Sequence, residues 1–360
     1  MKKALFLALK GRGRVHPNPL VGAVVVKSGR ILGQGAHEYF GGPHAELNAI
    51  RAAGNAGGAT LYVTLEPCAH SGKTPPCTNF IIKNKIKRMV VATKDVNPLV
   101  SGKGLAQLKK AGISVKQGVL EAQARELNRD FNFWIRHRRP YVIVKSAQSV
   151  DGKIATFTGD SKWISSEASR DRAHALRAAS DAVLVGVNTV IKDDPELTVR
   201  RPKTLPADRQ PIKIVLDSTL RTPVSARLFK NTKPESVWIV TANSAPISKE
   251  KRYRDLATVI RVKKVHARLD LKGFLQRIGK QGVVNVLIEG GGEVIAHALK
   301  EKLVHEMHCV IAPKIIGGKN AVNAVSGEGI ALVKKAIQLK NLSVELVGGD
   351  IWVKGSPRYV

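Results

Sequence analysis

The sequence contains little cysteine, few aromatic residues and no long apolar run, and each shortage excludes a class of protein. Three cysteines among 360 residues cannot form a disulfide framework, which favours a reducing, cytoplasmic setting. Aromatic residues make up 5% of the chain, which is poor material for stacking the bases of single-stranded nucleic acid. Because no run of about eighteen apolar residues occurs, we expect no transmembrane helix and no membrane partner.

Acidic residues are also scarce, and the chain is therefore unusually basic. Lys and Arg total 59 against 28 Asp and Glu, which gives a formal net charge of +31. Such a field attracts anions, including nucleic acid and phosphorylated small molecules. The basic residues are spread along the chain and the aromatic residues are few. We therefore expect phosphorylated small molecules as ligands, and no nucleic acid.

Length and hydrophobic pattern predict two α/β domains, because 360 residues exceed what one core usually holds. Apolar runs at 21–26, 61–65 and 88–93 predict buried strands in the first half. A basic run closed by Pro140 then interrupts the pattern, so we expect domains at 1–138 and 139–360. Strands of a mostly parallel second sheet are predicted over 141–147, 181–187, 212–217, 237–242, 283–289 and 308–313, with a terminal hairpin at 342–354.

Three metal-ligand types and a carboxylate are grouped in the first domain. His44 and Glu46 fall in the first turn of a predicted helix, Cys68 follows a strand and Cys77 begins the next helix. A structural zinc site takes four protein ligands, whereas a catalytic site takes three and leaves a position for water. We therefore predict that His44, Cys68 and Cys77 bind a catalytic Zn²⁺. Glu46 is then predicted to move the protons of a hydrolytic deamination.

The spacing of the two cysteines separates this site from the common nucleoside and nucleic-acid deaminases. Eight residues lie between them, whereas the short deaminase motif has two. Two alternatives stay open: a polynucleotide deaminase with a basic binding domain, and a non-catalytic zinc protein in which His70 supplies a fourth ligand. A second cluster, at 305–309, lacks the spacing of a zinc-protease helix, and we expect it to be structural.

The second domain contains a strand, a glycine turn and a helix in succession. The predicted strand at 283–289 ends at Gly290, Gly291 and Gly292, which lead into an apolar helical segment. Exposed amides at such a helix start can hold a cofactor pyrophosphate. The motif is not Gly-x-Gly-x-x-Gly, and a simple tight turn has the same pattern. Alone, it therefore does not identify a cofactor.

Long motifs in both domains resemble those of the bifunctional deaminase/reductases of riboflavin biosynthesis, and the resemblance runs almost end to end. The matching stretches are HPNPLVG (16–22), GGPHAE (41–46), TLEPCAHSGKTPPC (64–77), SVDGKIA (149–155), SKWI (161–164), VGVNTV (185–190), DDPELTVR (193–200) and EGGG (289–292). The chain departs from the family pattern at Ala23, where a cysteine is expected. It also departs at 95–98, where Asp-Val-Asn-Pro replaces Asp-Pro-Asn-Pro.

The resemblance implies two reactions on two folds. A cytidine-deaminase-like α/β/α domain would remove an amino group from 2,5-diamino-6-(5-phosphoribosylamino)pyrimidin-4-one. A dihydrofolate-reductase-like α/β domain would then use NADPH to reduce the ribosyl group to a ribityl group. The resemblance identifies no proton donor for the reduction. We also expect a homo-oligomer whose subunit number the residues do not define.

The resemblance also implies the residues that bind each ligand. For NADPH these are Ala147, Trp163, Thr189, Asp193, Ser218, Gly290, Gly291, Gly292, Glu293 and Val294. For the substrate of the deaminase they are Asn18, His37 and Lys73, with Asn18 able to donate to and accept from a pyrimidine edge. For the substrate of the reductase they are Lys153, Ser161, Arg177, Leu197, Arg200 and Glu289, with the two arginines as bidentate donors to phosphate.

Overall fold

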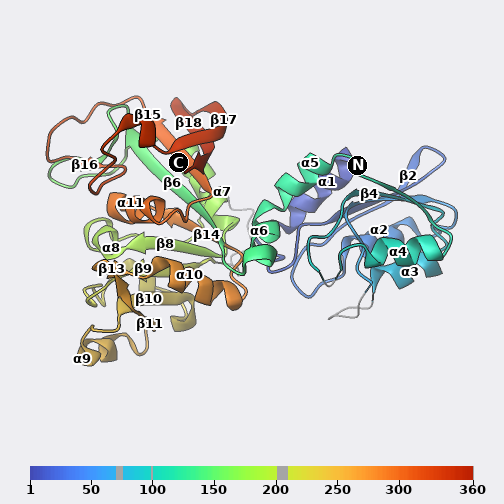
Figure 1. The fold of residues 1–360 in the computed structure, drawn as a ribbon, viewed down its shortest axis with the longest axis horizontal. Coiled ribbons are helices and arrows are strands. Elements are labelled where there is room, and N and C mark those ends of the chain that lie inside the picture. Colours follow the sequence, from blue (N-terminus) through green and yellow to red (C-terminus); the bar gives the residue numbers. More distant parts are fainter. Residues whose placement is uncertain (70–75, 99, 201–209, 360) are drawn as a thin grey trace. The chain divides into compact units, whose positions relative to one another are not determined.

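The structure, a computed structural model, describes residues 1–69, 76–98, 100–200 and 210–359. The chain divides into two compact units, Met1–Arg139 and Pro140–Val360. Each unit is a sheet covered by helices (Figure 1), which confirms the predicted α/β class. Within the described ranges, no helix has the length and apolar character that a membrane crossing requires.

The first unit is built on a five-stranded sheet of order β2-β1-β3-β4-β5. Strand β1 is antiparallel to both of its neighbours, β2 and β3, whereas β3, β4 and β5 are parallel to one another. The strands are β1 (Gly22–Lys27), β2 (Arg30–Ala36), β3 (Thr60–Leu65), β4 (Arg88–Thr93) and β5 (Ser114–Gln117). The helices are α1 (Lys2–Ala8), α2 (Ala45–Ala53), α3 (Cys77–Lys83), α4 (Lys103–Lys110), α5 (Glu121–Leu127) and α6 (Arg129–His137).

Both faces of this sheet are covered, which explains why its strands are continuous apolar runs. Ala23 and Val25 of β1 pack with residues of α2, α3 and α4, while Val24 between them packs against α1. Helix α2 lies close to β2 at Gly35. A Cβ atom on this residue would lie only 2.4 Å from the backbone nitrogen of Ala49, so no larger residue fits there. The glycine therefore allows the close approach that fixes the start of α2.

The second unit contains a nine-stranded sheet of order β11-β10-β9-β8-β14-β6-β15-β18-β17. Neighbouring strands from β11 to β15 are parallel, and the terminal hairpin is antiparallel. The strands are β6 (Tyr141–Ser149), β8 (Ala182–Gly186), β9 (Ile212–Leu216), β10 (Val237–Ala242), β11 (Thr258–Val262), β14 (Asn285–Glu289), β15 (Glu306–Ala312), β17 (Gln338–Val347) and β18 (Asp350–Arg358). Short strands are β7 (Lys153–Ala155), β12 (Lys264–Val265), β13 (Arg268–Leu269) and β16 (Val322–Asn323).

Helices cover the two faces of this sheet, and the order of its strands indicates where a ligand would bind. They are α7 (Glu167–Ala178), α8 (Val187–Asp193), α9 (Ile247–Glu250), α10 (Leu271–Lys280) and α11 (Gly292–Lys300). Leu184 of β8 packs in one core with α10 and α11, and its neighbour Val185 packs in the other with α8. The chain leaves β8 towards β9 but leaves β14 towards β15, on the opposite side. The carboxyl ends of β8 and β14 are thus a topological switch point, where open α/β sheets bind ligands.

Candidate active sites

The three metal-ligand types of the first unit meet at the starts of two helices. His44 is the residue before α2, Cys77 is the first residue of α3, and Cys68 lies three residues beyond β3. Their ligand atoms all lie within 4.8 Å of one another. His44 Nδ1 lies 3.0 Å from Cys77 Sγ and 3.7 Å from Cys68 Sγ, so this nitrogen faces both sulfurs.

The donor set fits a zinc ion. Zinc takes nitrogen at about 2.0 Å and sulfur at about 2.3 Å in a tetrahedron, which places neighbouring ligand atoms at separations close to those found here. One imidazole and two thiols also make up the soft set that zinc prefers. No second cluster of three or more His, Cys, Asp or Glu side chains in the described ranges could hold a metal.

The two thiols of this cluster have opposite electrostatic environments. A hydrogen bond from Cys77 and the neighbouring His44 outweigh burial and lower the pKa of Cys68 to about 4. The same contact with Cys68, together with burial, raises the pKa of Cys77. The sulfurs therefore hold one proton between them, and a metal cation would displace that proton. The backbone N–H of Cys77 also donates to Cys68 Sγ over 3.4 Å, which favours the thiolate form at Cys68.

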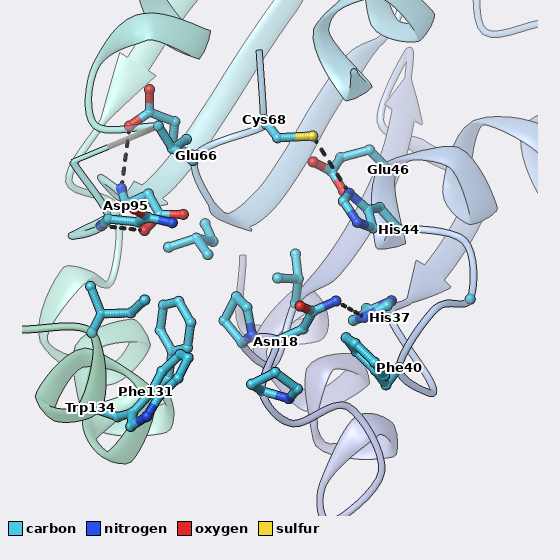
Figure 2. Close-up of a pocket in the computed structure, with 18 of the residues that line it drawn as sticks. Asn18, His37, Phe40, His44, Glu46, Glu66, Cys68, Asp95, Phe131 and Trp134 are labelled. Carbon is cyan, nitrogen blue, oxygen red and sulfur yellow. Dashed lines mark hydrogen bonds between the residues drawn. The ribbon is translucent and has the colours of Figure 1, made fainter. Parts of the chain in front are cut away.

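Glu46 lies in the first turn of α2 and is 3% exposed. Burial raises the pKa of its carboxyl group above the ordinary value, although His44 acts in the opposite direction. A carboxyl group with a raised pKa can hold a proton at a pH where most carboxyl groups are ionised. Glu46 faces the same cavity as His44 and Cys68 (Figure 2).

Asn18 and His37, two predicted substrate residues, form a hydrogen-bonded pair beside the metal cluster. His37 Nδ1 lies 3.0 Å from the carbonyl oxygen of Pro43, and Nε2 lies 3.1 Å from Asn18 Nδ2. Since a carbonyl only accepts, Nδ1 carries the proton and Nε2 accepts from the amide. Burial lowers the pKa of His37, which keeps this ring neutral. Lys73 and His70 lie outside the described residues.

A cavity of about 400 Å³ extends from the metal cluster to an aromatic wall. In Figure 2 this wall is on the opposite side of the cavity from Cys68 and His44, and Phe131 and Trp134 form it. Their ring centroids are 6.3 Å apart, and the guanidinium of Arg138 lies 5.3 Å from the Trp134 ring centroid. The spacing of Phe131 and Trp134 is that of an amphipathic helix, so the sequence pattern indicates a core role and does not by itself place them at a site.

Two polar residues of the cavity were also missed as site residues. Asp95 and Asn97 line it, at the position where the departure from the family pattern was expected to affect only the local geometry of a substrate loop. The Asp95 carboxylate accepts from the Asn97 backbone N–H over 2.8 Å, and the Asp95 N–H donates to Glu66 over 3.3 Å. Glu66 also accepts from Gly102 and Leu105. This buried carboxylate therefore holds the loop that bears Asp95 against the end of β3.

In the second unit, predicted cofactor residues lie within or after four neighbouring parallel strands. Ala147 is in β6, Ser218 lies two residues beyond β9, Thr189 and Asp193 are in α8, and Glu293 and Val294 are in α11. Gly290 and Gly291 have φ of +92° and +77°, a conformation that glycine adopts without strain. A Cβ atom at Gly291 would lie 3.3 Å from Thr189 Oγ1. The fold thus brings Thr189 to the glycine turn at the switch point.

Arg177 and Glu289, two predicted substrate residues, form a largely buried ion pair on this sheet, with side chains 13% and 10% exposed. Arg177 donates to Glu289 over 2.5 Å and to the Thr198 carbonyl over 2.5 Å. Burial acts to raise the pKa of Glu289, but Arg177 and Lys145 outweigh it, so the pKa is lowered. Lys145 is the register partner of Glu289 across β6 and β14. These three charged groups are therefore close together beneath α7.

The other predicted residues of this unit are held by separate contacts. Lys153 donates to Asn323 Oδ1 over 2.6 Å, and Ser161 donates to Asp193 Oδ1 over 3.0 Å. Leu197 is buried with φ of +54°. Arg200 and Trp163 are exposed. Arg200 donates to Glu196 over 2.7 Å. The Cζ atom of Arg170 lies 4.5 Å from the ring centroid of Trp163.

The histidines of the cluster at 305–309 form hydrogen bonds within the fold. His305 Nδ1 accepts from the Val142 backbone N–H over 2.9 Å. His308 is buried between Glu306, at 2.6 Å, and Trp352, whose Nε1 donates to His308 Nδ1 over 3.0 Å. These bonds engage both nitrogens of His308 and Nδ1 of His305 within the fold, which agrees with the structural role expected for the cluster.

Two family models match the chain, one for each unit. The cytidine and deoxycytidylate deaminase zinc-binding region matches residues 1–93, and the RibD C-terminal domain matches residues 140–353. The fold and the sites thus define a deaminase and a reductase joined in one polypeptide.

Known proteins with both parts are similar along nearly the whole chain. The riboflavin biosynthesis protein RibD of Aquifex aeolicus is 47% identical over 98% of this chain and 96% of its own, and that of Escherichia coli is 38% identical over 98% and 96%. A crystal structure of the deaminase/reductase from Thermotoga maritima, 37% identical, covers 99% of this chain and 97% of its own with a TM-score of 0.85. This chain belongs to the RibD family of bifunctional deaminase/reductases in riboflavin biosynthesis.

Proposed function

We propose that this chain carries out two successive steps on one pyrimidine nucleotide. The first is zinc-dependent hydrolytic deamination of 2,5-diamino-6-(5-phosphoribosylamino)pyrimidin-4-one. The second is NADPH-dependent reduction of the ribosyl group to a ribityl group. The main support is the placement of Glu46, buried at one end of the cavity beside His44, Cys68 and Cys77. A non-catalytic zinc protein has no use for a buried carboxyl group there.

The deamination needs a nucleophile and a proton carrier in the same cavity. His44, Cys68 and Cys77 would hold Zn²⁺, which when bound makes water nucleophilic near neutral pH. Glu46 would accept a proton from the attacking water and pass it to the ring nitrogen. It would then carry the second proton, from the hydroxyl on the attacked carbon, to the amino group, which leaves as ammonia while the carbonyl forms. Its raised pKa suits a group that holds the proton between these steps.

Substrate orientation in the first unit would come from Asn18, His37 and the aromatic wall. The hydrogen bond from the Asn18 amide to His37 fixes the direction of that side chain, which leaves Asn18 Oδ1 to accept from the pyrimidine. Phe131 and Trp134 present apolar surface at the other end of the cavity, where the substituent at position 6 would lie. Lys73 stays a candidate for the phosphate by resemblance alone.

In the second unit the cofactor would supply the hydride, and the protein would supply orientation. The amides from Gly290 to Val294, beside Thr189, would hold the pyrophosphate. Ala147, Trp163, Asp193 and Ser218 would contact the rest of NADPH. Arg177 and Arg200 would bind the substrate phosphate, with Lys153, Ser161, Leu197 and Glu289 around the sugar and the base.

One experiment tests both halves. The protein is incubated with the diaminopyrimidine nucleotide, with and without NADPH, while ammonia release and the absorbance of NADPH are followed. We expect ammonia in both mixtures and NADPH oxidation only after deamination. If neither signal appears, the proposal is wrong, whereas ammonia alone would leave the second unit without its activity. A polynucleotide deaminase would instead release ammonia from nucleic acid and bind it with a strong dependence on salt.

We also propose a cytoplasmic homo-oligomer. Leu342, Val344 and Leu346 of the edge strand β17 are 59%, 64% and 80% exposed. An exposed apolar edge strand can pair with a strand of another chain. We therefore propose that β17 pairs with a second copy of this protein. Sedimentation equilibrium tests the assembly, and a monomer at micromolar concentration would contradict it.

A further inference from the structure

The loop that follows β9 is held in a fixed shape by Asp217. This aspartate has no exposed surface. Its carboxylate accepts from the Arg221 backbone N–H over 2.6 Å, from the Thr222 N–H over 2.7 Å and from the Thr222 hydroxyl over 2.8 Å. Because these donors surround one carboxylate, residues 218–221 form a rigid turn at the carboxyl end of β9.

Asp217 occupies a position that discriminates between dinucleotides in related folds. β8, α8 and β9 form a strand-helix-strand unit with parallel strands. An acidic residue at the end of the second strand of such a unit often binds the ribose hydroxyls of NAD, whereas a nearby arginine accommodates the additional phosphate of NADP. The buried carboxylate of Asp217 is committed to the turn. It is therefore not available to a ribose.

Arg221 is exposed and extends from this turn to the first turn of α8. Its Nη2 donates to Asn188 Oδ1 over 2.9 Å, which holds the guanidinium at the first turn of α8. In the part of the chain that the structure describes, no carboxylate forms an ion pair with Arg221. One hydrogen bond leaves most of the five guanidinium donors open, enough for a bidentate contact with phosphate.

Two more cations lie along the same turn. Arg252 Nη2 donates to the Leu220 carbonyl over 3.0 Å, and Lys249 Nζ donates to the Thr219 carbonyl over 3.4 Å. The turn is therefore bordered by three basic side chains, while its one carboxylate is buried. A dianionic group would be favoured at this edge of the sheet.

We infer that Arg221, oriented by Asn188, binds the phosphate on the adenosine ribose of NADPH and makes the second unit selective for NADPH over NADH. This inference rests on the proposed reductase function, because it assumes a dinucleotide in the switch-point crevice. It goes beyond that function by assigning the choice between two cofactors to one guanidinium. The turn built by Asp217 determines where that guanidinium lies.

The test compares the binding of 2′,5′-ADP and 5′-AMP to the full-length protein by isothermal titration calorimetry. These probes differ only in the ribose phosphate. We expect Arg221→Ala to weaken 2′,5′-ADP at least about tenfold, as the loss of a charged hydrogen bond predicts, and to change 5′-AMP less than about twofold. Asn188→Ala should give a smaller loss of the same selectivity. Arg254→Ala, which removes an exposed arginine of the same unit, should change neither.

The outcomes separate this inference from the proposed function. If the wild-type protein binds NADP⁺ and 2′,5′-ADP but Arg221→Ala keeps the same ratio of affinities for the two probes, the inference is wrong and the reductase function stands. An equal loss for both probes would also overturn it, because the side chain would then support the loop and not the phosphate. If the wild type binds no dinucleotide, the proposed reductase function fails and the inference fails with it.

Discussion

In the first unit the three metal-ligand atoms lie within 4.8 Å of one another, and Glu46 beside them is buried. In the second unit most of the residues predicted to bind the cofactor are spread over four neighbouring strands and the segments after them, and two of them, Trp163 and Glu293, are exposed. A site that activates water has to place a few groups at bonding distance. A site that receives a cofactor has to present a long surface, because the cofactor carries the reactive atom.

Loss of the metal should have the largest effect, because it should abolish the activity of the first unit and leave that of the second unchanged. Cys68→Ser removes one of three ligands, so we expect little zinc to remain and ammonia release to fall to background. NADPH oxidation with the deaminated nucleotide should be unchanged. Metal analysis and the two assays measure these effects. Cys309→Ser, which changes the cysteine outside the cluster, should retain zinc and both activities. A zinc-free protein that still releases ammonia would contradict the role of the cluster.

Glu46→Gln should remove proton transfer and leave the metal in place. We expect the turnover of deamination to fall about 10³-fold, within the range for loss of a general acid-base group. Zinc content and reductase activity should be those of the wild type. Glu38→Gln, an exposed substitution in the same unit, serves as the control. Deamination by the Glu46 variant at a near-normal rate would exclude the assigned role.

Arg177→Ala should destabilise the second unit in a way that depends on pH. Removing one partner of a buried ion pair costs about 3–5 kcal/mol. This pair is 13% and 10% exposed, so we expect a loss near the lower end of that range, because the Glu289 carboxylate is left largely buried. In the wild type the pKa of Glu289 is lowered, so its contribution to stability is present at neutral pH and is lost as the pH falls through that lowered value. Without Arg177 burial dominates, the pKa rises, and protonation relieves the penalty. The variant should therefore lose less stability at pH 5 than at pH 7.

Hydrogen exchange in β6 and β14 during a urea titration measures this effect. Arg172→Ala is the matched control, since it lies on the same helix and pairs with Glu345, whose side chain is 52% exposed. An exposed pair contributes about 1 kcal/mol or less. Equal losses in the two variants would show that the buried pair has no special weight.

Arg200→Ala should have the smallest effect, on binding alone. We expect the KM of the reductase for its phosphorylated substrate to rise about tenfold, as for loss of a charged hydrogen bond, with little change in kcat. Arg227→Ala is a close control, because Arg227 also pairs with Glu196 and both side chains are 51% exposed. If the two variants behave alike, the phosphate assignment of Arg200 is wrong.

The sequence was most informative where a residue type has few alternative roles, as histidine and cysteine do at a metal cluster. His44, Cys68 and Cys77 could be proposed as a cluster because they are chemically distinct and close in sequence, and the structure brings their ligand atoms together. Strands β2 and β5 were not predicted, since β2 contains two glycines that face α2 and β5 is a polar edge strand. Glycine and edge positions lack the apolar alternation on which strand prediction depends.

The missed site residues share a different cause, because their role arises from tertiary structure. Phe131 and Trp134 have ordinary helical spacing, and only the fold turns them towards the cavity. Arg221 is one of 59 basic residues, and its relation to Asn188 depends on the turn that Asp217 builds. Neither the position of the two aromatic rings at the cavity nor the bond between Arg221 and Asn188 is indicated by a local sequence pattern. The roles proposed for the individual site residues stay predictions.

The aromatic wall has a consequence for how such proteins can be recombined. His44, Glu46, Cys68 and Cys77 all precede residue 93, where the matched zinc-binding region ends, while Asp95, Asn97, Phe131 and Trp134 follow it. A chimaera joined at residue 93 would therefore take the proposed zinc ligands and Glu46 from one parent and much of the cavity wall from the other. Under the proposed roles, reaction type and substrate choice would be encoded in separable stretches of this gene and could change independently in evolution.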